Sequence, residues 1–345
     1  MKAALLTAPK KVEIRNIKNL NLPAETEVLL KVNSVGVCGS DMHYYKYGKI
    51  GDQAVEYPFI VGHELSAQVI KTGKRVTNLH TGDKVAVDPA ISCGQCDQCA
   101  QSRSHTCRHL LFLGCPGQRE GGLCEQIIMP ARNCYRLPKS MSYDLGVMVE
   151  PVSIGLYAVR MLDLFRPGSI AVLGMGPIGL CVLLSLKDRQ KHKVYVTDKI
   201  DTRLALAKKL GAVWGANPDS VDIVAEMLHH VPLSLDAVFE CSGDPEAIKQ
   251  AVDLLKPGGQ LIIVGIPEQD TISFDINQLR RKELVIKNVR RQNECSVAAI
   301  DLVMRRSKDI KKMITHRFSL AEVKKAFNMV AGYRDGVVKA LIKMK

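Results

Sequence analysis

Four cysteines gather in one short stretch of the chain. Cys93, Cys96, Cys99 and Cys107 form the pattern C-x2-C-x2-C-x7-C. Four thiolates at this spacing can complete a tetrahedral shell around zinc. Because the protein would then fill every coordination position, no position remains for a substrate, and we expect a structural zinc. Disulfides, free thiols or an iron–sulfur cluster are the alternatives for such a cluster.

A second set of possible metal ligands is more dispersed. Cys38 opens the run C-G-S-D-M-H, and His63 and Glu64 follow in the run G-H-E. One thiolate, one imidazole and one carboxylate can hold zinc while leaving a position open for a substrate. Each residue also has a simpler explanation, as a buried cysteine, a hydrogen-bonded histidine or a surface glutamate. The residues alone leave a catalytic metal as one of two interpretations.

A glycine-rich turn predicts a nucleotide site. The turn G-x-G-x-x-G consists of Gly174, Met175, Gly176, Pro177, Ile178 and Gly179. It stands between a predicted strand and a predicted helix, where backbone N–H groups and the helix N-terminus can bind a pyrophosphate. Asp198, at the end of the next predicted strand, can accept hydrogen bonds from the adenosine ribose and repel a 2′-phosphate, which favours NAD over NADP. Lys199 could tolerate that phosphate, and a plain glycine turn with a surface aspartate is the alternative.

The elements around these motifs differ between two parts of the chain. Residues 1–150 predict short strands and turns, with strands over 27–32, 67–70 and 84–87. From about residue 151, strands alternate with helices, which predicts a doubly wound parallel sheet. The expected strands are 169–173, 194–197, 235–239 and 260–264, and the expected helices are 178–186 and 202–210. This alternation fades after about residue 280, and the tail predicts a helix near 320–331 and a strand near 337–342.

Composition limits the class of protein. The chain has 345 residues, of which 46% are hydrophobic and 24% charged, so we expect about two globular domains. It has no uninterrupted apolar run of about 18 residues and no signal-peptide core, so we expect a cytoplasmic protein without a membrane partner. The net charge of +13 is spread along the chain without a nucleic-acid-binding motif. We therefore expect no nucleic-acid partner, although a zinc-stabilised nucleic-acid-binding protein is the alternative from another class.

Taken in order, these segments resemble the zinc-containing alcohol dehydrogenases of the medium-chain superfamily, and the resemblance covers essentially the whole chain. The run His43–Gly51, followed by Pro58 and the G-H-E motif, looks most like sorbitol and xylitol dehydrogenases, as does Glu150 before Pro151. The resemblance implies an α/β protein with two domains. Residues 1–150 and 282–345 would form a GroES-like, mainly β catalytic domain, and residues 151–281 an inserted Rossmann domain that binds NAD.

The resemblance also implies a ligand set for a catalytic zinc. Cys38 and His63 would bind the metal, and Glu64 and Glu150 would complete the set directly or through a water molecule. With the four-cysteine site, this makes two zinc ions per subunit.

Further roles follow from the same resemblance. Ser40 would take the proton of the alcohol, His43 would pass it toward solvent, and Tyr44 and Arg290 would contact the substrate. We assign Arg203 and Gly265 to the cofactor site, beside the glycine turn and Asp198.

The implied reaction is hydride transfer from a secondary hydroxyl of a sugar alcohol to NAD, which gives a ketose. A phosphorylated polyol, an inositol, butanediol and threonine are alternative substrates. Arg291 stands where the sorbitol enzymes generally have a tyrosine, and two adjacent cations would favour an anionic substrate. Ala67 replaces the last glycine of the family pattern G-H-E-x-x-G.

The resemblance implies a homo-oligomer, either a dimer or a tetramer. Buried thiols are expected at the remaining cysteines, Cys115, Cys124, Cys134, Cys181, Cys241 and Cys295.

Overall fold

The computed structural model describes residues 1–164, 166–189 and 192–344. The chain forms two compact units, one made of Met1–Glu150 with Ser296–Lys345 and the other of Pro151–Cys295. The first boundary falls where the sequence places it. The second lies after Cys295, whereas the sequence analysis places it at residue 282. The reason is that a further strand of the second unit follows residue 282.

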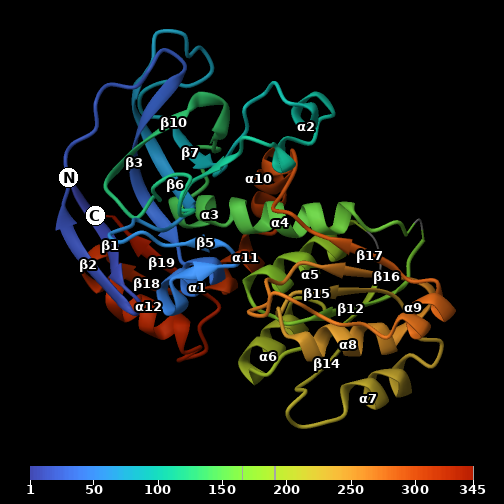
Figure 1. The fold of residues 1–345 in the computed structure, drawn as a ribbon. Helices are drawn as coiled ribbons and strands as arrows, with labels where there is room; N and C mark the ends of the chain where they lie inside the picture. The colour runs from blue at the N-terminus through green and yellow to red at the C-terminus, as the bar shows by residue number, and fades with distance from the viewer. Residues whose placement is uncertain (165, 190–191, 345) are drawn as a thin grey trace. The chain divides into compact units, whose positions relative to one another are not determined.

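A mixed sheet forms the centre of the first unit. Its strands follow the order β11-β7-β6-β3-β19-β18, and β10 pairs with β3. Figure 1 shows β19, from the end of the chain, beside β3, from its beginning. The strands are β3 (Glu27–Gly36), β6 (Glu64–Thr72), β7 (Lys84–Val87), β10 (Gln126–Pro130), β11 (Cys134–Arg136), β18 (Ile314–Ser319) and β19 (Lys339–Lys343). Shorter pairs are β1 (Lys2–Ala8) with β2 (Lys11–Asn16), β4 (Lys49–Ile50) with β5 (Gln53–Ala54), and β8 (Ala90–Ile91) with β9 (Leu111–Phe112).

Alternation of side chains explains the sheet of the first unit. Val28, Leu30 and Val32 of β3 are buried, whereas Lys31 between them is exposed. Side chains of a strand point alternately to the two faces of its sheet, so this spacing gives β3 one core-facing side. The strand β19 differs, because a lysine, Lys339, is buried within it.

The first unit also contains helices, of which α3, α11 and α12 pack against this sheet. The helices of this unit are α1 (Gly39–Tyr47), α2 (Asp97–Ala100), α3 (Tyr143–Val147), α10 (Ser296–Arg305), α11 (Ser307–Met313) and α12 (Val323–Ala331). The first of them, α1, begins directly after Cys38, whose backbone N–H donates to the Asp41 carboxylate. The helix ends at Tyr47, and Gly48 caps it in the left-handed conformation that glycine tolerates. Tyr45 of α1 meets Phe327 of α12 edge to face, with ring centroids 5.2 Å apart.

The second unit is a doubly wound sheet of six parallel strands. Their order is β14-β13-β12-β15-β16-β17, which is the 3-2-1-4-5-6 order of a dinucleotide-binding fold. The strands are β12 (Ser169–Leu173), β13 (Lys193–Thr197), β14 (Trp214–Ala216), β15 (Leu235–Glu240), β16 (Leu255–Ile263) and β17 (Val285–Asn288). The helices are α5 (Pro177–Arg189), α6 (Asp201–Lys209), α7 (Ile223–His230), α8 (Pro245–Leu254) and α9 (Ile276–Lys282), and α4 (Val149–Arg160) spans the boundary between the units.

The sequence predicts four of the six strands of this unit, together with the helices α5 and α6. The strand expected at 260–264 begins earlier, at Leu255, and includes the Pro257-Gly258-Gly259 segment. A register shift between Leu235 and Ala237 of β15 accommodates those residues. The strand β17 was not predicted at all, because it is an edge strand with exposed positions and lacks the continuous apolar run of a central strand.

No helix in the described parts of the chain combines the length and the apolar character that crossing a membrane requires.

Candidate metal and cofactor sites

The dispersed ligand set is brought together in the first unit. Cys38 precedes α1, His63 precedes β6, and Glu64 is the first residue of β6. One ligand atom of each residue lies within 4.8 Å of the ligand atoms of the other two. The strand pairing explains part of this arrangement, because Glu64 lies opposite Gly36, two residues before Cys38. Sulfur, nitrogen and oxygen donors therefore converge at one end of the β3–β6 pair.

Asp41 orients two of these ligands. Its Oδ2 accepts a hydrogen bond of 3.0 Å from the backbone N–H of Cys38, and its Oδ1 accepts one of 3.2 Å from that of Gly62. The same Oδ1 lies 3.5 Å from Nδ1 of His63. A carboxylate at Nδ1 leaves Nε2 for a metal, which is the usual arrangement of a zinc-bound histidine. Burial lowers the pKa of His63, but the charges of Asp41 and Cys38 outweigh it and hold that pKa well above its usual value.

Lys339 is a residue of this site that the motifs did not reveal. Its Nζ donates to both carboxylate oxygens of Glu64, at 2.7 and 2.6 Å, and to the carbonyl of Val37 at 3.2 Å. Both charged side chains are 1% exposed. A carboxylate has about four lone-pair sites, so Glu64 can meet Lys339 and still offer an oxygen to a metal. The available signal was a single lysine within the apolar run Val337–Ile342.

Glu150 is buried in the same unit but is not a member of the group whose ligand atoms lie within 4.8 Å of one another. Burial raises the pKa of Glu150 to about 7, while the charge of His63 acts in the opposite direction and that of Glu64 adds to the rise. The structure therefore places Glu150 within electrostatic reach of both residues.

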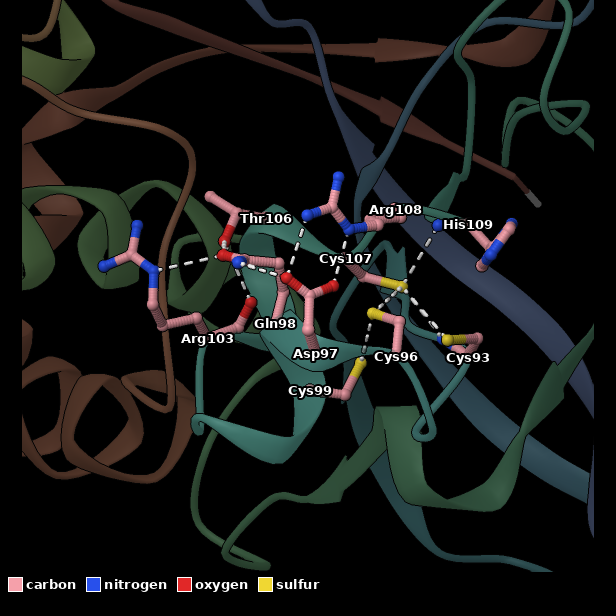
Figure 2. Close-up of polar contacts among 10 residues, drawn as sticks. All are labelled: Cys93, Cys96, Asp97, Gln98, Cys99, Arg103, Thr106, Cys107, Arg108 and His109. Atoms are coloured by element: carbon pink, nitrogen blue, oxygen red, sulfur yellow. Dashed lines mark hydrogen bonds and ion pairs between the residues drawn. The ribbon is translucent and has the colours of Figure 1, made fainter.

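The four-cysteine stretch folds into a compact cluster, which Figure 2 shows. The Sγ atoms of Cys96 and Cys99 are 3.6 Å apart, and those of Cys93 and Cys107 are 3.5 Å apart. All four sulfurs lie within 4.8 Å of one another. Backbone N–H groups point at these sulfurs; that of Cys93 lies 3.2 Å from Sγ of Cys107. Hydrogen bonds from the backbone of Arg108 and of Cys99 lower the pKa of Cys96 to about 6.

Polar side chains brace this cluster from outside. Arg108 forms a two-point ion pair with Asp97, with Nε 2.5 Å from Oδ1 and Nη2 2.9 Å from Oδ2. Gln98 accepts hydrogen bonds from Thr106 and Arg103 through its Oε1, as Figure 2 shows. These contacts join the helix α2, which carries Cys99, to the segment that carries Cys107.

The six other cysteines are not part of either ligand group. They are Cys115, Cys124, Cys134, Cys181 and Cys295, which are buried, and Cys241, which is partly buried.

The glycine turn lies at the carboxyl ends of β12 and β13 in the second unit, as expected. Gly174 follows β12, and its N–H donates to the carbonyl of Thr197 at 2.8 Å. A Cβ on Gly179 would lie 1.9 Å from the carbonyl oxygen of Gly174, so only glycine fits there. Pro177 and Ile178 begin α5, which directs its N-terminal N–H groups at the turn.

Asp198 closes this turn. It is 8% exposed, and its Oδ2 accepts a hydrogen bond of 2.6 Å from the N–H of Met175, between the first two glycines. Its Oδ1 accepts a second, of 2.8 Å, from Ile200. Burial raises the pKa of Asp198, against the opposing charge of Arg203. Arg203 is also buried, and its guanidinium lies 3.7 Å from the position of a Cβ on Gly176.

Lys199, beside Asp198, is directed to another carboxylate. Its Nζ lies 3.0 Å from Oδ2 of Asp244, at the N-terminus of α8. Gly265 follows β16 and approaches Gly243 so closely that a Cβ on it would lie 2.3 Å from the Gly243 nitrogen. The residues assigned to the cofactor site thus share one edge of the parallel sheet.

The residues assigned to proton transfer and substrate binding are placed as follows. Ser40 and His43 are half-buried on α1, near Cys38 in the chain. Tyr44 is 4% exposed, and its hydroxyl lies 3.3 Å from Oε1 of Gln53 and 3.7 Å from Sγ of Cys115. Arg290 is exposed and belongs to the second unit, after β17. The roles of these four residues stay predictions.

The donor sets fit zinc. Four converging sulfurs form a closed site of the structural type. One sulfur, one imidazole and one carboxylate form an open site of the catalytic type, and the hydrogen-bonded Asp41 behind His63 supplies the outer support that such sites need. The glycine turn lacks side chains at Gly174, Gly176 and Gly179 and is hydrogen-bonded to the buried Asp198, so it fits a dinucleotide.

Comparisons with known proteins agree with this geometry. Residues 24–139 match the family model of the alcohol dehydrogenase GroES-like domain, and residues 177–312 match that of the zinc-binding dehydrogenases. Sorbitol dehydrogenase of Bacillus subtilis is 33% identical over 346 residues, which cover 99% of this chain and 97% of the relative. L-idonate 5-dehydrogenase of Vitis vinifera is 30% identical over 312 residues, or 88% of this chain and 85% of the relative.

Solved structures show the same fold. A putative zinc-binding dehydrogenase from Sinorhizobium meliloti 1021, bound to NADP, superposes with a TM-score of 0.90 at 28% identity and covers 99% of both chains. Galactitol-1-phosphate dehydrogenase from Escherichia coli has a TM-score of 0.89 at 26% identity and covers all of both chains.

The fold and the two ligand groups define a two-unit, zinc-binding oxidoreductase. The chain belongs to the zinc-containing medium-chain alcohol dehydrogenases, in the branch that contains the polyol dehydrogenases.

Proposed function

We propose that this chain is an NAD-linked dehydrogenase with two zinc ions per subunit, which oxidises a secondary hydroxyl of a sugar alcohol to a ketone. The observation that carries the proposal is the convergence of Cys38, His63 and Glu64. A zinc ion bound there would act as a Lewis acid that lowers the pKa of the substrate hydroxyl. The nicotinamide ring would accept the hydride.

The side chains of the first unit would carry out the remaining steps. Asp41 holds the Cys38 backbone and faces Nδ1 of His63, so it fixes both ligands before a substrate arrives. Lys339 neutralises Glu64, which limits the negative charge around the metal position. Ser40 would receive the hydroxyl proton and His43 would pass it on, since both lie on α1 next to Cys38.

The position of Asp198 supports NAD rather than NADP. Its buried carboxylate is tied to the glycine turn, so a 2′-phosphate would meet a fixed negative charge. Lys199, the cation that could offset that charge, is engaged by Asp244. A zinc-binding dehydrogenase with the same fold is bound to NADP, so the residues at this position, and not the fold, would select NAD in this chain.

Sugar alcohols are the favoured substrates for two reasons. Relatives of this chain are sorbitol dehydrogenases, and Glu150 before Pro151 resembles the glutamate of the polyol enzymes. A second candidate is an anionic polyol, such as a phosphorylated hexitol or a sugar acid. The adjacent cations Arg290 and Arg291 favour it, and a relative is named for a phosphorylated polyol. A nucleic-acid-binding function would leave both the open ligand set and the glycine turn without a role.

The test is the appearance of NADH absorbance when the purified protein and NAD meet a panel of alcohols. The panel contains sorbitol, xylitol, iditol, galactitol, inositol, galactitol 1-phosphate, butanediol and threonine, each with NAD or NADP and with or without a zinc chelator. We expect chelator-sensitive reduction of NAD by unphosphorylated polyols. Activity restricted to phosphorylated or acidic members would favour the second candidate, and silence across the panel with intact NADH binding would refute both.

The cofactor preference has its own test. Asp198→Asn keeps an acceptor oxygen for the Met175 N–H but removes the negative charge. Like charges held together cost several kcal/mol, so we expect kcat/KM for NADP relative to NAD to rise at least about tenfold. An unchanged ratio would contradict the role of Asp198.

A further inference from the structure

Glu240 is a buried carboxylate that the zinc and glycine motifs leave unexplained. It is the last residue of β15 and is fully buried. Its side chain accepts hydrogen bonds from the loop that follows it, at residues 241–244. Its Oε1 accepts from the backbone N–H of Ser242 at 2.6 Å, from the Ser242 hydroxyl at 2.5 Å and from the N–H of Gly243 at 2.8 Å. Three donors on one oxygen fix the path of this loop.

This loop lies directly against the glycine turn. The N–H of Cys241 donates to the carbonyl of Leu173, the residue before Gly174, at 2.8 Å. A Cβ on Gly174 would lie 2.8 Å from the nitrogen of Ser242. Glu240 therefore holds the backbone segment against which Gly174, the first glycine of the turn, packs.

The same loop reaches the acidic end of the nucleotide site. The Ser242 hydroxyl accepts a hydrogen bond of 3.0 Å from the N–H of Asp244. Asp244 caps α8 and pairs with Lys199, the neighbour of Asp198. A displacement of Ser242 would thus move both the backbone that contacts the glycine turn and Asp244, the partner of Lys199.

The second carboxylate oxygen of Glu240 behaves differently. Within the described residues, Oε2 is buried without a hydrogen-bond partner. It faces Gly265, where a Cβ would lie 2.6 Å from it. Burial raises the pKa of Glu240, against the hydrogen bonds of the loop. Because Oε1 accepts all three hydrogen bonds, an amide oxygen can replace it, whereas a side chain without an acceptor cannot.

We propose that Glu240 is a positioning residue of the cofactor site, which holds the loop 241–244 against the glycine turn and so fixes the backbone that binds the dinucleotide. The proposal rests on the proposed function, because it assumes that the second unit binds a nicotinamide dinucleotide. Glu240 would act through this loop, whose backbone it holds.

The experiment measures NADH binding by fluorescence titration of the full chain. Glu240→Met keeps the length of the side chain but removes the acceptor, and leaving buried donors unpaired should raise the Kd for NADH about tenfold or more. Glu240→Gln keeps an acceptor oxygen and should bind NADH within about threefold of the wild-type protein. Ser242→Ala, which removes one of the three donors, serves if Glu240→Met does not fold, and should weaken binding by a few-fold.

The control separates positioning from loss of stability. Met227 is fully buried on α7, in the core of the same unit and away from the loop in the chain. Met227→Ala should lower the melting temperature and leave the Kd for NADH unchanged. If Met227→Ala weakens binding as much as Glu240→Met, or if both Glu240→Met and Ser242→Ala bind as the wild type does, the inference is overturned. A wild-type chain that binds neither NADH nor NADPH would instead overturn the proposed function, and this inference with it.

Discussion

Lys339 and Glu64 form an ion pair that is closed off from solvent, with Nζ 2.6 Å from one carboxylate oxygen and 2.7 Å from the other. The partners are 275 residues apart in the chain and meet because β19 and β6 both pair with β3. A buried charge is costly unless it is paired, so each partner accounts for the presence of the other. The pair also ties the last strand of the chain to the proposed catalytic metal position.

Removing the lysine of this pair should destabilise the protein. Lys339→Met leaves the Glu64 carboxylate buried and uncompensated, so the free energy of unfolding should fall by about 3–5 kcal/mol. Urea unfolding of the zinc-free protein measures this. Lys71→Met, at an exposed position of β6, is the control and should change the free energy by less than about 0.5 kcal/mol. Adding Glu64→Gln to Lys339→Met should restore part of the loss. Equal stability of Lys339→Met and Lys71→Met would show that the pair contributes nothing.

Asp41 should control zinc affinity at the open site. Asp41→Asn cannot accept from both Cys38 and Gly62 and also serve the His63 ring, since one of its two oxygens becomes an amide nitrogen. Loss of such outer support typically lowers metal affinity about 10–100-fold. Competition with a chromogenic chelator measures the affinity of the open site for zinc. Unchanged affinity would mean that Cys38 and His63 are held by the fold without Asp41.

The four-cysteine site should hold its own zinc ion. Cys99→Ser should remove about one zinc ion per chain and lower the melting temperature, because a closed site contributes to folding. Elemental analysis and thermal unfolding provide the two readouts. The control is Cys124→Ser, since a serine hydroxyl can donate to the carbonyl of Gln126 as the Cys124 thiol does. A zinc content equal to that of the control would contradict the structural-zinc assignment.

Asp144 should make stability depend on acidic pH. Burial raises its pKa, but hydrogen bonds from Lys343 and Arg317 outweigh burial and lower that pKa below its ordinary value. The folded protein then binds fewer protons than the unfolded chain, so this stability is present above the ordinary carboxyl pKa of about 4 and is lost as the pH falls through the lowered value. At pH 7, Asp144→Asn should cost about 1–3 kcal/mol.

Urea unfolding across the acidic range tests this pH dependence. The difference between the wild-type protein and Asp144→Asn should shrink as the pH falls below about 4. Asp52→Asn, at an exposed position of the same unit, should show a small difference that does not follow this course. A difference for Asp144→Asn that is constant with pH would refute the ionic interpretation.

Patterns of residues close together in the sequence were enough to predict much of the metal and cofactor sites. The four cysteines lie within one local loop, so their spacing was enough to predict that their sulfurs converge. The glycine turn and Asp198 were equally readable, because a βαβ unit places the end of one strand beside the turn that follows its neighbour. The central strand β12 was predicted with its observed bounds, since a fully buried strand is a continuous apolar run.

Only the tertiary structure reveals contacts between residues whose positions in the sequence show no regular spacing. The strand β17 and the unit boundary after Cys295 escaped prediction, because an edge strand has little hydrophobic signal of its own. The hydrogen bond from Ser242 to Glu240 is local in the sequence. Its connection with the cofactor site appears only in the fold, where Gly174 packs against Ser242. Lys339 meets Glu64 through the pairing of strands from opposite ends of the chain. Strand register fixes such contacts, and register depends on the whole sheet rather than on the residues that flank a lysine.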